Sequence, residues 1–319
     1  MAQHFLLSAA ARTLSLRAIY RMTDEEAFAL FATIRFAENA GDPFCPACGC
    51  CDPYFISTRR KWKCKACGKN FSATSGTIFA SRKMAFVDLL AAICIFCNAA
   101  KGISALQLSR DLDCQYKTAY VLAHKLREAM ALGNDGVTLD GVVEVDGAHF
   151  GGHVRPENRK EDRKDRRLRE HQDRDRRVVV ALRQRGGRTL PFVVKREPEG
   201  AEIVRQRVAL GAELHADEAT HWDVLELLYR AHRINHSEAY SWDGACTNQA
   251  ESYFSRLRRA VAGQHHHVSH KYLHQYANEM AWREDYRRTD NGGLFRKALG
   301  SALHSPVSRT WKGYWQRAA

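Results

Sequence analysis

The sequence has no run of apolar residues long enough to cross a membrane. A helix needs roughly 20 such residues to span a bilayer, and the longest candidate, Phe86 to Cys97, is shorter and contains Asp88. The N-terminus also lacks the continuous apolar core of a signal peptide, because Arg12 and Arg17 interrupt it. We therefore expect a cytoplasmic protein that has no membrane partner.

Acidic residues are too few to balance the basic ones. The 319-residue chain has 49 Lys and Arg against 36 Asp and Glu, which gives a formal net charge of +13 at pH 7. Hydrophobic residues at 45% and charged residues at 27% are typical of a globular protein, and the length allows two or three domains. The positive excess favours a polyanionic partner, most commonly nucleic acid, over a merely soluble basic protein.

Six of the ten cysteines fall within one short segment, Cys45 to Cys67. In a cytoplasmic chain such clustering favours zinc over disulfides. Two Cys-x-x-Cys pairs there are each followed by Gly, so that each turn points both thiolates at one place, and the 15 residues between the pairs suit a hairpin. The sequence therefore predicts a zinc ribbon whose ligands are Cys45, Cys48, Cys64 and Cys67, although Cys50 or Cys51 could replace a neighbour. Cys94 and Cys97 have the same spacing in apolar surroundings, and we expect them in the core.

Basic and aromatic residues interleave around the predicted ribbon. The pattern suits DNA contact, and the alternative is a solvated basic hairpin. The candidate DNA-binding residues are Arg59, Arg60, Lys61 and Lys63, with Tyr54, Trp62 and Phe71 as aromatic neighbours.

Helices are predicted on both sides of the ribbon. Thr23 and Glu26 form a capping-box pattern before a packing helix. After the ribbon, Ser104 can cap a helix that points Leu106 and Leu108 inward, and a second helix follows from Tyr116. The pair suggests a helix-turn-helix whose recognition helix begins with Lys117 and Thr118. Helical pairs are common, so a plain packing pair remains the alternative.

The second half of the chain reads as an α/β domain. Strands are predicted at 142–150, 177–183, 189–195, 213–217 and 233–235, helices at 201–210, 222–229 and from Asn248, and a charged loop at 155–177. Asp146 and Asp217 end the first and fourth strands, which are neighbours in a ribonuclease-H-like sheet, and Glu251 follows in a helix. Acids held together repel one another unless cations neutralise them. Mg²⁺ suits such a site because it prefers oxygen ligands.

Five segments together resemble a bacterial insertion-sequence transposase of the DDE class, from the group with an N-terminal zinc ribbon. They are CPACG…CKACGKNFSATSGTIF, VEVDGAHFGGHVRP, HADEATHWD, INHSEAYSWDGACTNQAESYFSRLRRA and GQHHHVSHKYLHQYANEMAWRED. The resemblance implies a ribonuclease-H-like mixed sheet with flanking helices, preceded by a small zinc ribbon and a helix-turn-helix-like region. It spans nearly the whole chain.

The resemblance also implies the activity and its residues. It implies Mg²⁺- or Mn²⁺-dependent cleavage and strand transfer at terminal inverted repeats, with Asp146, Asp217 and Glu251 as the catalytic, metal-binding acids. Asn248 is the alternative third ligand, because some relatives have Asn there. The family often has Lys seven residues after the Glu; here Arg258 takes that place, and we expect it to hold DNA phosphates with Arg256 and Arg259. Many relatives have an acid after the first Asp, where this chain has Gly147.

The expected domains are a helical lead-in (1–40), the zinc ribbon (41–80), a helix-turn-helix-like region (81–136), the catalytic domain (137–288) and a C-terminal tail (289–319). The expected partners are double-stranded DNA and a second copy of the chain on paired ends, in the bacterial cytoplasm at the nucleoid. Two alternatives stand beside this hypothesis. One is a catalytically silent zinc-ribbon regulator, and the other is a metal-dependent nuclease without strand transfer.

Overall fold

The computed structural model describes residues 5–151, 157–165, 168, 171, 176–234, 241 and 246–317. The chain forms two compact units, residues 1–132 with 286–319 and residues 133–285. Within the described ranges, no helix is long and apolar enough to cross a membrane. Of the loop expected at 155–177, residues 155–156, 166–167, 169–170 and 172–175 lie outside the described residues, and the described stretch 157–165 is exposed.

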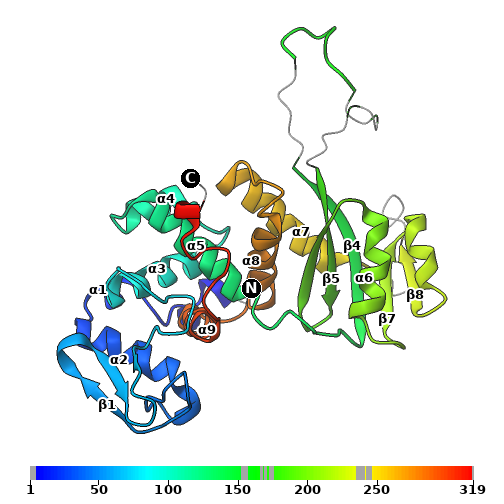
Figure 1. Cartoon of the computed structure of the whole chain (residues 1–319). Coiled ribbons are helices and arrows are strands. Elements are labelled where there is room, and N and C mark those ends of the chain that lie inside the picture. The colour runs from blue at the N-terminus through cyan, green and yellow to red at the C-terminus, as the bar shows by residue number, and fades with distance from the viewer. Residues whose placement is uncertain are drawn as a thin grey trace. The chain divides into compact units, whose positions relative to one another are not determined.

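The first unit is built mainly of helices, with a small ribbon beside the helix at Asp24–Arg35 (Figure 1). Its elements are η1 (Phe5–Leu7), η2 (Ala9–Ala11), α1 (Leu16–Tyr20), α2 (Asp24–Arg35), η3 (Ala37–Asn39), β1 (Pro53–Ile56), η4 (Ser57–Arg59), β2 (Lys61–Cys64), β3 (Asn70–Phe71), α3 (Phe86–Asn98), α4 (Ala105–Asp111), α5 (Tyr116–Met130), α9 (Asn291–His304) and α10 (Tyr314–Arg317).

The apolar helix α3 forms the core of this unit. Nine of its residues are buried, Cys94 and Cys97 among them as expected. Helices α1, α2, α4 and α9 pack against α3. The predicted capping box begins α2, because Thr23 Oγ1 accepts from the Glu26 N–H at 3.2 Å and Glu26 Oε2 accepts from the Thr23 N–H at 2.7 Å.

The second unit is the predicted α/β domain. Its elements are β4 (Val142–Phe150), β5 (Arg177–Gln184), β6 (Thr189–Val194), η6 (Glu197–Glu199), α6 (Gly200–Arg207), β7 (Glu213–Asp217), η7 (Thr220–Leu225), β8 (Arg230–Ile234), α7 (Asn248–Ala260), the π-helical turn η8 (Val261–His265) and α8 (Leu273–Asp285). The helix expected at 222–229 is instead the 3-10 helix η7, which ends at Leu225. Asn235, expected in the last strand, lies outside the described residues.

The five strands form one mixed sheet in the order β6-β5-β4-β7-β8. Strands β4, β5 and β6 are antiparallel, whereas β7 runs parallel to both β4 and β8. The first and fourth strands are therefore neighbours, as the ribonuclease-H-like prediction requires. The register of β4 with β7 ends at Val145 and Ala216. Strand β7 stops at Asp217, whereas β4 continues to Phe150. The expectation that Asp146 ends its strand is therefore wrong, and the end of β7 lies beside the middle of β4.

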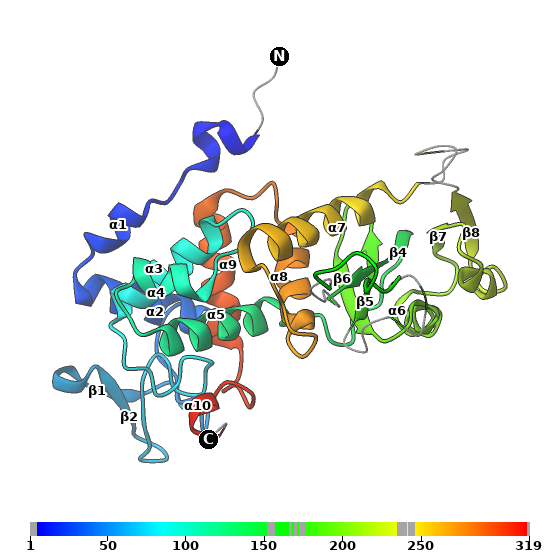
Figure 2. The same cartoon turned by 90° about the horizontal axis from the view of Figure 1, so that it is seen from above.

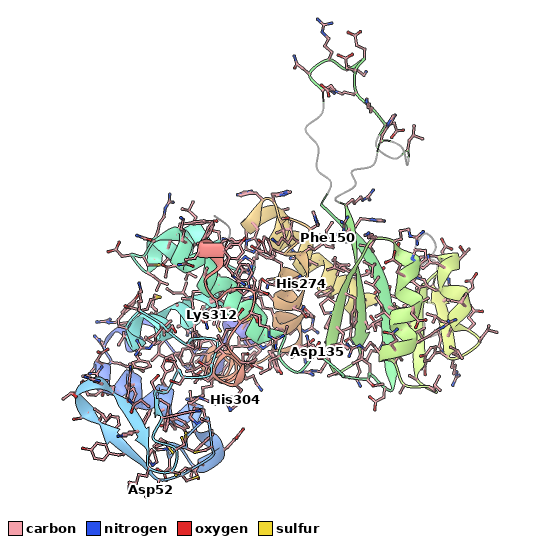
Figure 3. All side chains as sticks on the ribbon, in the orientation of Figure 1. Asp52, Asp135, Phe150, His274, His304 and Lys312 are labelled. Atoms are coloured by element: carbon pink, nitrogen blue, oxygen red, sulfur yellow. The ribbon has the colours of Figure 1, made fainter. Side chains whose placement is uncertain are left out.

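The two faces of the sheet are covered by different helices (Figures 1 and 2). Alternate residues of β4 point to opposite faces: Val143 and Val145 join the core beneath α6 and η7, whereas Ala148 and Phe150 join the core beneath α7 and α8. Figure 3 labels Phe150 at the end of β4. Asp146 shares the face of Ala148, so its side chain lies on the α7 side of the sheet.

Candidate functional site

The four predicted zinc ligands lie together in the ribbon. Their sulfur atoms are all within 4.8 Å of one another, with 3.6 Å between Cys45 and Cys67 and 3.5 Å between Cys48 and Cys64. Four thiolates at about 2.3 Å from a tetrahedral zinc ion lie about 3.8 Å apart, so the cage fits zinc closely. Cys50 and Cys51 stand outside it, because their sulfurs lie against the backbone carbonyls of Asp52 and Gly49 instead.

Both cysteine knuckles have the same backbone geometry. The Gly49 N–H donates to the carbonyl of Cys45 at 2.8 Å, and the Gly68 N–H donates to that of Cys64 at 3.0 Å. The two glycines adopt φ of 75° and 70°, a left-handed conformation that other residues rarely take. Between the knuckles, β1 pairs with β2 as the predicted hairpin.

The basic residues of the ribbon differ in their exposure and in their ion pairs. Arg59, Lys61 and Lys63 are exposed, whereas Arg60 pairs with Asp24 at 2.7 Å and with Glu25 at 2.5 Å. A surface pocket beside them is lined by basic and hydroxyl groups: Arg59, Arg60, Lys61, Arg82, Ser72, Thr74 and Ser75.

The aromatic residues of the ribbon correct the sequence interpretation in part. Trp62 and Phe71 are buried and stack on one another at 5.6 Å, and Trp62 also stacks on Phe28 of α2 at 5.4 Å. They hold the ribbon on α2 and are not available to DNA. Tyr54 is 62% exposed, so it alone of the three remains available as a DNA contact.

The predicted pair of helices is present as α4 and α5, joined at residues 112–115. Ser104 caps α4 by accepting from the Gln107 N–H at 3.1 Å. Leu108 is buried as expected, but Leu106 is 50% exposed, so its predicted inward position is wrong. Helix α4 buries Leu108 and Ser109. Leu106 is two residues from Leu108, so it lies on the opposite, outer side of the helix.

The start of α5 carries Lys117 and Thr118, both exposed. The Lys117 ammonium lies 5.2 Å from the centre of the Trp315 ring. One turn on, Tyr120 contacts the rings of Trp311, Tyr314 and Trp315. The C-terminal residues therefore form an aromatic cluster against this helix.

Asp146 and Asp217 occupy equivalent positions on adjacent parallel strands. Val145 of β4 is paired with Ala216 of β7, and each aspartate follows directly. Neighbouring strands lie about 4.8 Å apart, so the two carboxylates emerge side by side. The Asp146 Oδ1 accepts from the Gly147 N–H at 2.7 Å, and the Asp217 Oδ1 accepts from the Ala219 N–H at 3.2 Å.

Glu251 lies in the first turn of α7, which packs on β4. Its charge acts on Asp146, as described below. Asn248, the alternative third ligand, is the first residue of the same helix and lies one turn before Glu251, on the same side.

The electrostatics of Asp146 are those of a crowded acidic site. Burial, followed by the nearby charges of Asp217, Glu197 and Glu251, raises the pKa of Asp146 to about 7, although the hydrogen bond from the Gly147 N–H acts in the opposite direction. Burial and Asp217 also raise the pKa of Glu197. Burial and mutual repulsion both disfavour the ionised form of these carboxyl groups, because the carboxylates lie close together in a place where water cannot fully solvate them.

The donor set at this place fits a divalent cation. Oxygen ligands and crowded negative charge are the conditions that Mg²⁺ and Mn²⁺ favour. The carboxylate atoms are farther apart than the cysteine sulfurs, since among the described residues the groups whose ligand atoms all lie within 4.8 Å are the four cysteines and Glu213, His215 and His232. A looser arrangement suits an ion that keeps several waters.

Glu197 is the functional candidate that the sequence did not identify. It begins η6, between Asp146 and Asp217 in the sequence and outside the strands and helix that carry the three acids. A Cβ atom built on Gly147 would lie 2.6 Å from Cδ and 2.9 Å from Cγ of Glu197. The carboxyl group of Glu197 therefore uses the space that Gly147 leaves open.

The arginines of α7 have separate surroundings. Arg256 pairs with the buried Glu284 at 2.9 Å, so it joins α7 to α8. Arg259 contacts Ser255, and Arg258 is exposed with its guanidinium 5.8 Å from the Phe254 ring. Arg258 lies seven residues after Glu251, which is two helical turns, and so faces the same side.

Glu213, His215 and His232 form a second group with metal-ligand chemistry. His215 Nδ1 accepts from the Cys246 backbone N–H at 3.2 Å, so its proton lies on Nε2, which contacts Glu213 at 3.0 Å. Burial lowers the pKa of His215, which keeps the ring neutral. The His215 and His232 rings stack at 4.9 Å and 18°, and His232 Nε2 lies 3.3 Å from Glu213 Oε1. The three residues form one polar network, whose ligand atoms lie within 4.8 Å of one another.

Two segments of the chain match known protein families. Residues 138–285 match the ISXO2-like transposase domain, and residues 22–70 match the transposase zinc-ribbon domain. The chain belongs to the zinc-ribbon insertion-sequence transposases of the DDE class. No curated protein and no solved structure matches it.

The two matched domains coincide with the two sites. The transposase domain contains the sheet with Asp146, Asp217 and Glu251, and the zinc-ribbon domain contains the four-cysteine cage. A transposase of this kind binds DNA and belongs to a family of DNA-cleaving enzymes. Its cysteine cage supports a structural zinc ion.

Proposed function

We propose that this transposase cleaves DNA at the terminal inverted repeats of its element and joins the freed ends to target DNA. The observation that carries the proposal is the position of Asp146 and Asp217, which directly follow the paired residues Val145 and Ala216 on adjacent strands. The charge of Glu251 also acts on Asp146. A cation would neutralise the repulsion between the crowded carboxylates. Membership of a family of DNA-cleaving transposases supports DNA as the substrate of this site.

Asp146, Asp217 and Glu251 are the residues that would hold Mg²⁺ or Mn²⁺. Two such ions, when bound, activate an attacking hydroxyl and stabilise the leaving oxygen of a phosphodiester. In the first step, water attacks phosphorus, the bond to the 3′ oxygen breaks and a 3′-hydroxyl is freed. In the second, that hydroxyl attacks a target phosphodiester, forming a new ester bond and releasing a target 3′-hydroxyl. One bond forms for each that breaks, so no outside energy source is needed.

DNA binding is assigned to exposed cations of both units. Arg59 and Lys61 of the ribbon line a pocket with basic and hydroxyl groups, which suits phosphate oxygens. Lys63 is exposed on the same strand as Lys61. Lys117 and Thr118 begin α5, the candidate recognition helix. Arg258 and Arg259 lie beyond Glu251 on α7 and are assigned to phosphates near the reacting strand. Arg60 and Arg256, engaged in ion pairs, contribute by positioning neighbouring groups.

A homodimer on paired ends is part of the proposal, since two ends must be cut and joined together. The expected domains, lead-in, ribbon, helix-turn-helix-like region, catalytic domain and tail, give the order in which these functions follow along the chain.

The test is an assay with Mg²⁺ and a labelled duplex carrying the element's own terminal repeat. Wild type should cut at the repeat end and transfer it to a second, unlabelled duplex. Asp146→Asn should bind the repeat with unchanged affinity and do neither, whereas Asp162→Asn, an exposed acid of the same unit, should behave as wild type. Cutting without transfer, with paired ends supplied, would indicate a nuclease. Binding without cutting by wild type, in Mg²⁺ and in Mn²⁺, would indicate a regulator.

A further inference from the structure

A layer of buried polar side chains lies next to the acids on the same face of the sheet, two residues earlier on each strand. Glu144 precedes Asp146 by two residues and His215 precedes Asp217 by two, so each shares the face of its aspartate. Glu144 and His215 are also paired across β4 and β7. Both are almost completely buried, at 0% and 1% exposure.

Glu144 binds the first turn of the helix that carries Glu251. Its Oε2 accepts from the backbone N–H of Gln249 at 2.8 Å and from that of Ala250 at 3.0 Å. These are the second and third residues of α7, whose N–H groups have no partner within the helix. A carboxylate at this place also interacts favourably with the helix dipole. Glu144 therefore caps α7 from a neighbouring strand.

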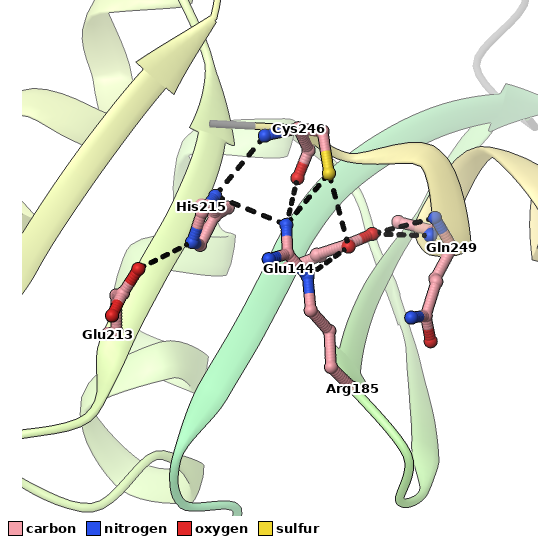
Figure 4. A network of polar contacts seen from close by, with 7 residues as sticks. Glu144, Arg185, Glu213, His215, Cys246 and Gln249 are labelled. Atoms are coloured by element: carbon pink, nitrogen blue, oxygen red, sulfur yellow. Dashed lines mark hydrogen bonds and ion pairs between the residues drawn. The ribbon is translucent and has the colours of Figure 1, made fainter. Parts of the chain in front are cut away.

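Arg185 and His215 extend the layer to the other acid-bearing strand (Figure 4). Arg185 Nε donates to Glu144 Oε1 at 2.8 Å, and its Nη2 donates to the Cys246 carbonyl at 3.0 Å. The Cys246 N–H in turn donates to His215 Nδ1. The chain just before α7 is thus held to β4 through Glu144 and to β7 through His215.

We propose that Glu144 is a positioning residue of the metal site, which sets Glu251 against Asp146 by capping α7. This inference rests on the proposed function. Glu251 follows Ala250 directly, so fixing the Ala250 N–H fixes the backbone from which the Glu251 side chain starts. A carboxylate two residues from Asp146 on one strand therefore determines where the third acid stands.

The test measures Mn²⁺ binding to the full chain, from the electron paramagnetic resonance signal of free Mn²⁺. Glu144→Met keeps the length of the side chain and removes both acceptor oxygens. We expect it to weaken Mn²⁺ binding by about 10- to 100-fold, as loss of a partner outside the ligand set typically does. Its zinc content should be unchanged, since the four cysteines are untouched. Glu144→Gln keeps one oxygen for the two N–H groups and should lose less.

The matched control is Glu213→Gln. It also removes a carboxylate charge from the buried layer's edge, on β7, but Glu213 contacts His215 and His232 and not α7. Its Mn²⁺ affinity should equal that of wild type. Thermal melting identifies folded variants. If Glu144→Met does not fold, the comparison of Glu144→Gln with Glu213→Gln decides.

The outcomes separate this inference from the proposed function. Mn²⁺ binding that Asp146→Asn abolishes and Glu144→Met weakens supports both. If folded Glu144→Met binds Mn²⁺ as tightly as wild type does, the positioning role is overturned and the metal site stands. If Glu144→Met does not fold, the same result in folded Glu144→Gln has the same meaning. Wild type that binds no Mn²⁺ overturns the metal site itself, and the positioning role with it.

Discussion

Glu197 fills the space beside Gly147 that a side chain at position 147 would need. Its Cδ would lie 2.6 Å from a Cβ atom there, so the two positions cannot both be occupied as they stand. The chain thus has a carboxyl group close to Asp146 that comes from η6 and not from the residue next to Asp146.

Gly147→Ala should displace the Glu197 side chain without unfolding the protein. The obstructing atoms belong to the end of a flexible side chain, so we expect less than about 1 kcal/mol of lost stability. In a Glu197→Ala background the same change should be neutral or stabilise by about 0.4–1 kcal/mol, since alanine restricts the unfolded chain. Urea denaturation of the four proteins measures this coupling. Equal effects in both backgrounds would show that the two residues do not compete for space.

Protein that retains its zinc but has no Mg²⁺ or Mn²⁺ bound should lose stability as the pH rises from about 4 to about 7. Burial, followed by neighbouring acids, raises the pKa of Asp146 to about 7 from an ordinary 3.8. The folded state therefore holds this proton more tightly than the unfolded state, and the contribution is present in acid and lost as the pH passes the folded pKa. Three pKa units correspond to about 4 kcal/mol at most.

Asp146→Asn removes this titration and is the control for that prediction. In buffer without Mg²⁺ or Mn²⁺, the variant should be more stable than wild type at pH 8 and lose that advantage at pH 4, by urea denaturation. An asparagine variant that is less stable than wild type at pH 8 would contradict the account, because it would show that the Asp146 carboxylate stabilises the metal-free fold.

Zinc binding should depend on the four cysteines of the cage and not on Cys50 or Cys51. Cys45→Ser and Cys64→Ser remove ligands of the cage and should lose the zinc ion together with the folded ribbon. Cys50→Ser and Cys51→Ser should keep about one zinc ion per chain, since their sulfurs lie outside the cage. Metal analysis of the purified variants measures this. Loss of zinc from Cys51→Ser would mean that the ligand set is different.

Two arginines that lie two residues apart on α7, and so on opposite sides of the helix, should fail in different ways. Arg258→Gln should leave stability unchanged and reduce the salt dependence of DNA binding by about one phosphate contact. Arg256→Gln leaves the buried Glu284 without its partner and should lower stability by up to about 3–5 kcal/mol. Binding titrations over a salt series, beside thermal melts, distinguish them. A lost phosphate contact in Arg256→Gln with normal stability would reverse the assignment.

The sequence predicted the elements whose pattern is local. The strand at 142–150 has the predicted bounds because its apolar residues and its flanking glycines mark both ends. The strand at 213–217 also has its predicted bounds, because the charged residues Asp217 and Glu218 follow its apolar residues. The four cysteines were identifiable because their spacing is itself the ligand geometry. The neighbouring positions of Asp146 and Asp217 followed from the order of the strands.

What the sequence could not predict depends on contacts between distant residues. Glu197 carries no motif, and only the close approach of η6 to Gly147 reveals it. Trp62 looked like a DNA contact because basic residues surround it, yet Phe28 of α2 covers it. The roles of Arg256 and Glu144 depend on partners 28 residues and more than 100 residues away along the chain. In each case a charged or aromatic side chain has an internal partner that spacing does not show.

The central claim is that Asp146, Asp217 and Glu251 hold one divalent metal site, and iron-directed cleavage of the protein tests it most directly. Fe²⁺ bound in place of Mg²⁺ generates hydroxyl radicals that cut the backbone near its ligands when ascorbate and peroxide are added. The account predicts fragments ending near residues 146, 217 and 251, suppressed together by excess Mg²⁺ and absent from Asp146→Asn. Cleavage confined to the cysteine ribbon, or cuts near these residues that Mg²⁺ and Asp146→Asn leave unchanged, would contradict it.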